Sequence, residues 1–159
     1  MRRAPGISRF LAAPAATKLM AFEAAFELVL ARLITLTSAK RFTSALGQQK
    51  DQPVAANQEQ QERATTIGHV VELTARAMPF RAVCLQQAIA LRRMLRRRNI
   101  PATVFLGVMP GAGGDIPDSP PIGGGELPMS AHAWVKSGDR IVNGKIAGLN
   151  RYVVLGQFS

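Results

Sequence analysis

The sequence has one cysteine, Cys84, and two histidines, His69 and His132. One cysteine cannot form an intramolecular disulfide, and the chain lacks the paired cysteines and the His-Glu-x-x-His spacing of common zinc sites. We therefore expect no disulfide within the chain, no metal centre and no cofactor. A lone thiol also fits a reducing compartment, so we expect a cytoplasmic protein.

Acidic residues are also few, because 10 Asp and Glu stand against 20 Lys and Arg, giving a formal net charge of +10. Such a balance attracts a nucleic acid, a membrane surface or an acidic peptide. No helix-turn-helix, RNA-binding motif or aromatic interleaving accompanies the main basic cluster, so we expect no nucleic acid. We expect an acidic peptide or a partner protein there, unless these arginines are simply a solvated helix face. The cluster comprises Arg92, Arg93, Arg96, Arg97 and Arg98.

Long apolar runs are absent as well. A membrane span needs about 20 mostly apolar residues, whereas residues 19–37 carry Glu23, Glu27 and Arg32, so no transmembrane span is predicted. The basic start of the chain resembles a secretory signal, but Pro14 and Lys18 interrupt its apolar part. We therefore do not predict a signal peptide.

Helical periodicity dominates the first two thirds of the chain. Apolar residues recur at three- and four-residue spacing within residues 8–46. Residues 48–62 are polar and rich in Gln, which indicates a linker or loop. Two further helices are predicted at about 65–78, before Pro79, and at about 84–98, before Asn99 and Pro101. The first periodic set comprises Leu19, Phe22, Phe26, Val29, Leu30 and Leu33.

Strands are predicted after residue 100. The β-branched and apolar segments at 102–109, 130–137, 140–144 and 151–158 fit strands, the middle two joined at Gly138-Asp139. Residues 110–128 hold six Gly and five Pro, which indicates a loop. Helices followed by a small antiparallel sheet give an α+β fold. We divide the chain into a helical N-terminal extension and linker, 1–62, and a core, 63–159.

Cys84 is the first candidate for chemistry. A free cysteine is most often a small buried core residue, and that reading alone would be preferred. However, Pro79 and the following residues place Cys84 in the first turn of a helix, where backbone N–H groups and the helix dipole favour a thiolate. Arg81 adds positive charge three residues upstream. The position therefore suits a nucleophile.

His132 lies on a predicted strand, as the base of a Cys–His pair requires. Its ordinary pKa of about 6.5 suits proton transfer near neutral pH, although a strand histidine can also be purely structural. Alternation places His132 on the same face as Trp134 and Lys136. The other histidine, His69, falls within a predicted helix beside its apolar stripe, and we expect a structural role there.

Several segments in this order resemble one family. The Cys84 segment PFRAVCLQQA, the run MLRRRNIP, the strand FLGV, the strand AHAWV and the closing VLGQF resemble the lasso peptide maturation peptidases, or B2 proteins. The resemblance covers about residues 65–158. It implies a transglutaminase-like or papain-like core, so the expected fold is α+β, with N-terminal helices followed by that core and its small antiparallel sheet.

The resemblance also implies a function. A lasso peptide leader peptidase would cleave the leader from a ribosomally made precursor peptide, with Cys84 as nucleophile and His132 as base. It implies two partner proteins, a separate leader-recognition protein (B1, or RiPP recognition element) and an asparagine-synthetase-like cyclase. Two alternatives remain open, a transglutaminase-like acyltransferase or amidase, and a non-catalytic basic scaffold that binds a peptide.

The sequence departs from the family at the third catalytic position. The family carries an Asp shortly after the HAW strand, and Gly144 occupies that position here. We expect Asn143 to orient the imidazole by accepting from Nδ1–H, because a tight hairpin would pair it opposite Trp134 on the face of His132. Asp139 is the other candidate, although it lies in the predicted turn.

Overall fold

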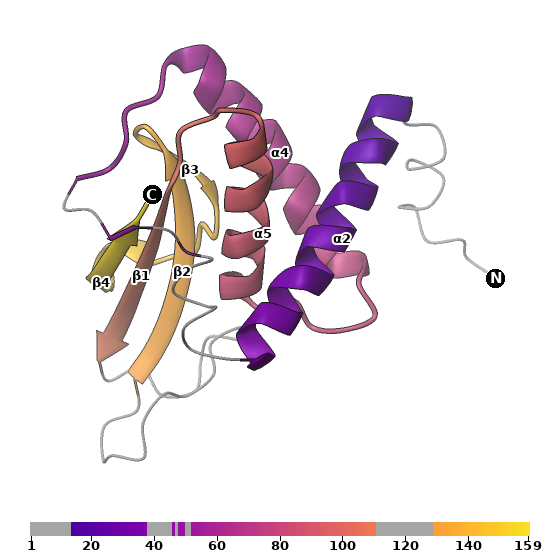
Figure 1. The fold of residues 1–159 in the computed structure, drawn as a ribbon. Coiled ribbons are helices and arrows are strands. Elements are labelled where there is room, and N and C mark those ends of the chain that lie inside the picture. Colours follow the sequence, from indigo (N-terminus) through magenta and orange to yellow (C-terminus); the bar gives the residue numbers. More distant parts are fainter. Residues whose placement is uncertain (1–13, 38–45, 47, 50–51, 111–128) are drawn as a thin grey trace.

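The computed structural model describes residues 14–37, 46, 48–49, 52–110 and 129–159 (Figure 1). Three helices, α2 (Ala15–Thr37), α4 (Gln58–Ala77) and α5 (Cys84–Arg97), are followed by β1 (Thr103–Pro110), β2 (Met129–Ser137), β3 (Arg140–Asn143), a 3-10 turn η1 (Leu149–Arg151) and β4 (Val153–Phe158). The predicted order of helices and then strands, and hence the α+β class, is confirmed. The predicted loop over 110–128 lies almost wholly outside the described residues.

The elements form three layers (Figure 1). The antiparallel sheet has the order β3-β2-β1-β4. Helices α4 and α5 pack on one face of the sheet, α4 mainly against β3 and α5 mainly against β2, and α2 packs on both helices from outside. The main core therefore lies between the sheet and α4–α5. Among the described residues, no helix combines the length and the apolarity that crossing a membrane requires.

The start of α4 differs from the prediction. Asn57 caps the helix, because its side chain accepts from the Gln60 N–H at 2.9 Å while the Gln60 side chain accepts from the Asn57 N–H at 3.0 Å. This reciprocal capping box begins the helix within the Gln-rich stretch. Residues 58–62, predicted as linker, are thus helical, and the division at residue 62 falls inside α4. The end of α5 agrees with the prediction, since Asn99 adopts a left-handed φ of 52°.

Helix α2 packs on the core with the face opposite to its periodic large apolar residues. Ala24, Leu28 and Ala31 are fully buried, and Glu27 is only 1% exposed. The periodic residues Leu19, Phe22, Phe26, Val29 and Leu33 point outward instead and are 42–70% exposed.

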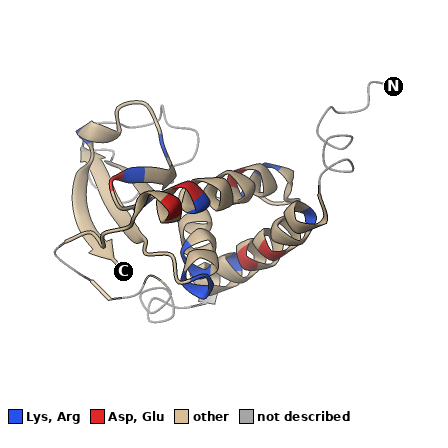
Figure 2. Cartoon of the chain, turned by 90° about the horizontal axis from the view of Figure 1, so that it is seen from above, with Lys and Arg blue, Asp and Glu red and all other residues tan. Residues whose placement is uncertain are grey.

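Ion pairs explain why α2 packs this way round. Glu27 accepts from Arg93 Nε at 2.6 Å and from Arg97 Nη1 at 2.7 Å, and Glu23 accepts from Arg97 Nη2 at 2.8 Å and from Arg98 Nη2 at 2.5 Å. Figure 2 shows the acidic residues carried by α2. Three arginines of the basic cluster thus pair with two glutamates of the chain's own helix. An external acidic partner of the cluster stays a prediction.

The pKa of Glu23 is lowered from 4.5 to about 2, chiefly by its hydrogen bond to Arg98. Because the pKa of Glu23 is lower in the folded chain, its ionised form stabilises the fold at pH values above its pKa in the unfolded chain. This stabilisation is lost as the pH falls from about 4.5 towards 2. The stabilisation that Glu23 contributes is therefore retained at pH values above about 4.5.

The far face of the sheet has its own apolar cluster. Phe105, Trp134 and Tyr152 are 5–7% exposed, and Ile146 and Leu149 pack against them. These last residues belong to the connection from β3 to β4, which crosses this face. This cluster therefore covers the far face over β1 and β2, whereas Val153, Val154 and Leu155 of β4 are exposed.

Glu27→Ala should lower the free energy of unfolding by roughly 2 kcal/mol, because it removes a buried acceptor of two charged hydrogen bonds. Urea unfolding of the purified chain measures this loss. The control is Glu59→Ala, which removes an exposed pair with Arg63 at 3.9 Å and should cost below about 0.5 kcal/mol. Equal losses in the two variants would show that the Glu27 pairs do not hold α2 to α5.

Candidate active site

Cys84 is the first residue of α5, as the sequence predicted. Its N-cap residue, Val83, makes no side-chain hydrogen bond to the first-turn amides. The Val83 N–H donates instead to Gln86 Oε1 at 3.3 Å, and Gln86 Nε2 donates to Thr35 Oγ1 of α2 at 3.2 Å. Cys84 is half-buried and packs against the core between the helices and the sheet. The thiol thus stands at the positive end of a helix that α2 holds in place.

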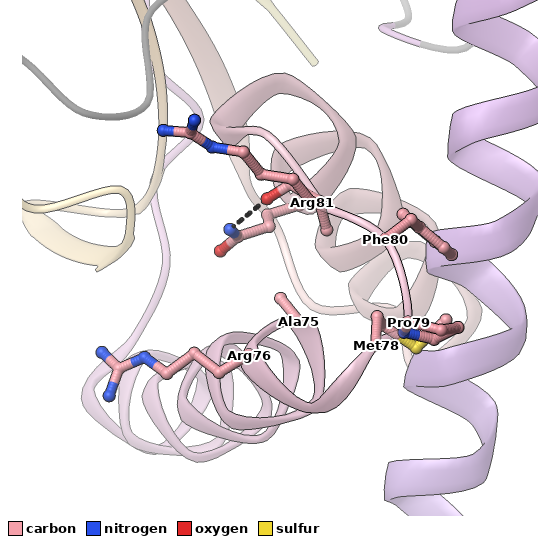
Figure 3. Close-up of a pocket in the computed structure, with 8 residues that line it drawn as sticks. Ala75, Arg76, Met78, Pro79, Phe80 and Arg81 are labelled. Atoms are coloured by element: carbon pink, nitrogen blue, oxygen red, sulfur yellow. Dashed lines mark hydrogen bonds between the residues drawn. The ribbon is translucent and has the colours of Figure 1, made fainter.

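A pocket of about 420 Å³ opens beside this helix start, between the end of α4 and the segment that precedes Cys84. Figure 3 shows Arg76 and Arg81 extending to one side, while Met78 and Phe80 turn to the other. The dashed bond is the one from Gln87 Nε2 to the Ala82 carbonyl, 2.8 Å long. The full lining comprises Ala75, Arg76, Met78, Pro79, Phe80, Arg81, Ala82 and Gln87. The pocket is therefore basic on one side and apolar on the other.

Helix α2 also fixes the apolar side of this pocket. The guanidinium of Arg32 lies 4.7 Å from the centre of the Phe80 ring, a cation–π distance. Together with the Gln86–Thr35 bond, this contact ties the end of α2 to the segment on either side of Cys84. The N-terminal helix is therefore part of the foundation of the candidate site.

His132 is 5% exposed on β2. Its ring lies 6.2 Å from Trp134 at 15° and 5.7 Å from Tyr152 at 53°, measured between ring centres. Its Nε2 is 2.8 Å from the backbone oxygen of Gly144. A carbonyl can only accept, so Nε2 carries the proton and, in the neutral imidazole, the lone pair is on Nδ1. The base nitrogen of His132 is thereby defined.

The strand register corrects the expected place of Asn143. A bulge between Val135 and Lys136 shifts the β2–β3 register, so Asn143 pairs with Val135 and not with Trp134. Val135 belongs to the core packed against the helices, and Asn143 points the same way. The orienting acceptor for His132 is therefore the neighbouring backbone carbonyl of residue 144, not the Asn143 side chain.

Asn143 instead contacts the two helices. Its Nδ2 donates to Glu72 Oε1 of α4 at 3.3 Å and to Gln87 Oε1 of α5 at 3.4 Å. Gln87 lies three residues after Cys84 on α5. Asn143 and Gly144 thus connect the first turn of the Cys84 helix to the imidazole of His132. The end of β3 thus adds a polar link between α5 and β2, which also pack directly on each other.

Glycine is required at residue 144. The backbone there has a φ of +75°, which L side chains rarely adopt. A Cβ would also lie 2.6 Å from the Ala133 oxygen and 2.9 Å from the Trp134 Cα. An aspartate could not occupy this backbone without moving it. The glycine at residue 144 and the use of its carbonyl by His132 therefore depend on the same backbone conformation.

The two strand motifs of the sequence meet physically. Gly107 of the LGV strand pairs directly with His132 of the HAW strand. A Cβ on Gly107 would lie 2.9 Å from the Trp134 ring, so the glycine makes room for that ring. Trp134 in turn stacks with Phe105 at 5.5 Å between ring centres and with His132. This packing sets the position of the imidazole.

The other candidates lie away from this point. Asp139 is exposed at the β2–β3 turn, and the five residue steps along β2 from His132 to Ser137 span roughly 16 Å. His69, expected to be structural, is exposed on α4. Within the described ranges, no group of three or more His, Cys, Asp or Glu residues could hold a metal ion.

The remaining question is whether Cys84 and His132 act together. Cys84 borders the core on the helix side of the sheet, whereas the His132 ring packs with Trp134 and Tyr152 of the second cluster. The structure packs α5 directly on β2 and links both to the end of β3, and the direct thiol–imidazole pair stays a prediction.

Comparison with known proteins gives one family. The family model described as the transglutaminase-like superfamily matches residues 26–157. No curated protein and no solved structure matches the chain.

The tautomer of His132 can be tested by long-range ¹H–¹⁵N spectra of the imidazoles. In its neutral form, His132 should carry its proton on Nε2 and show a downfield, pyridine-like Nδ1, while exposed His69 provides an internal reference. Asn143→Ala should cost about 1–3 kcal/mol of stability and leave this pattern unchanged. A proton on Nδ1, or a tautomer change in Asn143→Ala, would refute the role of the Gly144 carbonyl.

Proposed function

The chain belongs to the transglutaminase-like superfamily, and we propose that it is a cysteine peptidase that removes the leader from a ribosomally made precursor peptide, as in lasso peptide biosynthesis. One observation carries the proposal most. The Gly144 carbonyl accepts a hydrogen bond from His132 Nε2, with an N···O distance of 2.8 Å. In the neutral imidazole this places the proton on Nε2 and makes Nδ1 the basic nitrogen. The adjoining Asn143–Gln87 bond ties this point to the helix that Cys84 begins.

In the proposed reaction, Nδ1 of His132 takes the proton of the Cys84 thiol. The thiolate then attacks the carbonyl carbon of the leader–core junction, and the backbone N–H groups at the start of α5 donate hydrogen bonds to the developing oxyanion. The imidazolium returns its proton to the leaving amine of the core peptide. Water, deprotonated by the same imidazole, hydrolyses the thioester and regenerates the thiol.

The pocket beside Cys84 supports a peptide substrate. Its apolar side, with Met78 and Phe80, suits an apolar side chain, and the arginines on the other side suit a carboxylate. We therefore expect the precursor to place an acidic side chain near Arg76 and Arg81. The expected partners are a separate leader-recognition protein and an asparagine-synthetase-like cyclase that joins the freed amine to an acidic side chain.

A second function has a specific observation in its favour. The superfamily match fits a transglutaminase-like acyltransferase or amidase equally well, because these reactions share the thioester intermediate. The two functions differ in whether water or an amine resolves that intermediate. A non-catalytic scaffold would use neither.

Cys84→Ala should reduce leader cleavage to below about 1% of the wild-type rate when precursor and partner proteins are supplied, because it removes the nucleophile. Mass spectrometry of the precursor measures the cleavage. Arg63→Ala, exposed on the far part of α4, is a matched control that should cleave at the wild-type rate. Cleavage by a folded Cys84→Ala variant at the wild-type rate would rule out the nucleophile.

The same assay with added primary amine separates the two enzymatic functions. A peptidase yields the free leader acid as its main product, whereas an acyltransferase yields the leader amide. An amide as the main product would replace the peptidase proposal.

A further inference from the structure

Strand β4 forms one edge of the sheet (Figure 1). Its residues Val153, Val154 and Leu155 are 57%, 43% and 64% exposed. Val153 and Val154 are consecutive in the pairing with β1, so their side chains point to opposite faces of the sheet. Helices α4 and α5 pack mainly on β3 and β2, and the second apolar cluster covers the far face over β1 and β2. The first half of β4 therefore lies outside both covering layers.

The outer edge of β4 lacks the charged residues and prolines that commonly protect an edge strand. Residues 153–158, VVLGQF, contain neither. The opposite edge of the sheet is different, because β3 has only four residues and begins with Arg140. An apolar edge without this protection offers its backbone N–H and C=O groups to another strand.

The chain itself shows that this edge accepts a strand. The Gln48 N–H donates to the backbone oxygen of Ser159 at 3.2 Å, and the Ser159 N–H donates to the Gln48 carbonyl at 2.9 Å. The segment then turns towards the start of β1, where the Val54 N–H donates to Thr103 Oγ1 at 3.1 Å. Among the described residues, no further segment pairs with the outer edge of β4 at 153–157.

We propose that the outer edge of β4 at residues 153–157 binds an extended apolar peptide segment as a fifth strand of the sheet. Main-chain hydrogen bonds give such a complex its affinity, and apolar side chains of the peptide pack over Val153, Val154 and Leu155. The inference rests on the exposure, the composition and the existing pairing of this edge.

A second copy of the chain fits this edge less well than a peptide. Leu155 is an extra residue relative to β1, and this bulge bends the strand. A flexible peptide follows such an edge, whereas two copies would set two rigid bulges against each other. Contact between two five-residue edges also falls short of the roughly 1,000 Å² that a specific interface buries. Each copy moreover carries a net charge of +10, which opposes pairing.

The strand register places this edge relative to the candidate active site. Gly107 of β1 pairs with His132 on one side and with Val154 on the other. Because neighbouring strands lie about 4.8 Å apart, a strand added beside Val154 runs roughly 14 Å from the backbone of His132. About four extended residues span that distance. Under the proposed function, the bound segment belongs to the precursor and holds it at a distance from its scissile bond. That identification rests on the proposed function, whereas binding at the edge does not.

The test uses the full chain labelled with ¹⁵N and the synthetic peptide SGTVTVTGS, which is uncharged apart from its ends. The matched control peptide is N-methylated at its three central residues, which removes main-chain donors and keeps every side chain. In ¹H–¹⁵N spectra with peptide up to about 1 mM, the unmodified peptide should bind at least about tenfold more tightly than the control. The amide signals of residues 153–157 should shift on binding.

Val154→Ser/Leu155→Ser should weaken the binding at least about fivefold, because apolar contacts at the edge are lost. The matched control variant is Leu36→Ser/Leu73→Ser, which changes two exposed apolar side chains of α2 and α4 and should bind as the wild type does. Both variants should unfold cooperatively, since all four side chains are exposed. Equal binding of the two peptides, binding without shifts at 153–157, or no binding would overturn the proposal.

Two further measurements separate this inference from its alternatives. A dimer seen by sedimentation of the wild type and lost in Val154→Ser/Leu155→Ser would assign the edge to a second copy and overturn the proposed peptide. Cys84→Ala should bind the peptide as the wild type does. No peptide binding by a chain that cleaves its precursor would reject only the edge site. Peptide binding by a chain that cleaves no precursor would reject only the peptidase proposal.

Discussion

The hydrogen bond from His132 Nε2 to the Gly144 carbonyl is the constraint on which the candidate site depends. It fixes which imidazole nitrogen can accept a proton, a task that a carboxylate or amide side chain performs in other Cys–His and Ser–His sites. A backbone carbonyl cannot supply the full charge of an Asp, but it sets the same tautomer. Gly144 can bring its carbonyl to this point because its backbone is left-handed and its missing Cβ leaves room for the neighbouring strand.

The helices show how the chain's excess of arginine is used. Arg93, Arg97 and Arg98 bind two glutamates of α2. Most of the basic cluster therefore forms ion pairs within the chain, although its sequence suggests an external acidic partner. These ion pairs determine which face of α2 packs on the core. The large apolar side chains of the opposite face of α2 are left exposed.

Much of the fold follows from local sequence patterns. Helix α5, the four strands and the turn at Gly138 were predictable, because apolar periodicity, Pro101 and β-branched runs determine them locally. The position of Cys84 at a helix start follows from the same signals. The start of α4 was missed because a Gln-rich stretch was interpreted as a linker, although Asn57 and Gln60 form a capping box that the sequence does contain.

Other features could not be predicted from the sequence. The β2–β3 bulge moves Asn143 to the helix side of the sheet, and no residue pattern signals it. The orienting group is a backbone carbonyl, which every residue has, so only geometry identifies it. The inward face of α2 depends on Glu27 and its distant arginines, and periodicity alone favours the opposite face. These are long-range contacts that outweigh local preference.

The proposed reaction requires that Cys84 and His132 form one reactive pair. The most direct measurement is the rate of Cys84 alkylation by iodoacetamide at pH 7 in the folded wild type, in folded His132→Ala and in the urea-unfolded chain. The claim predicts that the wild type reacts at least about tenfold faster than the other two, because the imidazole draws the proton from the thiol. A His132→Ala variant that reacts as fast as the wild type would contradict it.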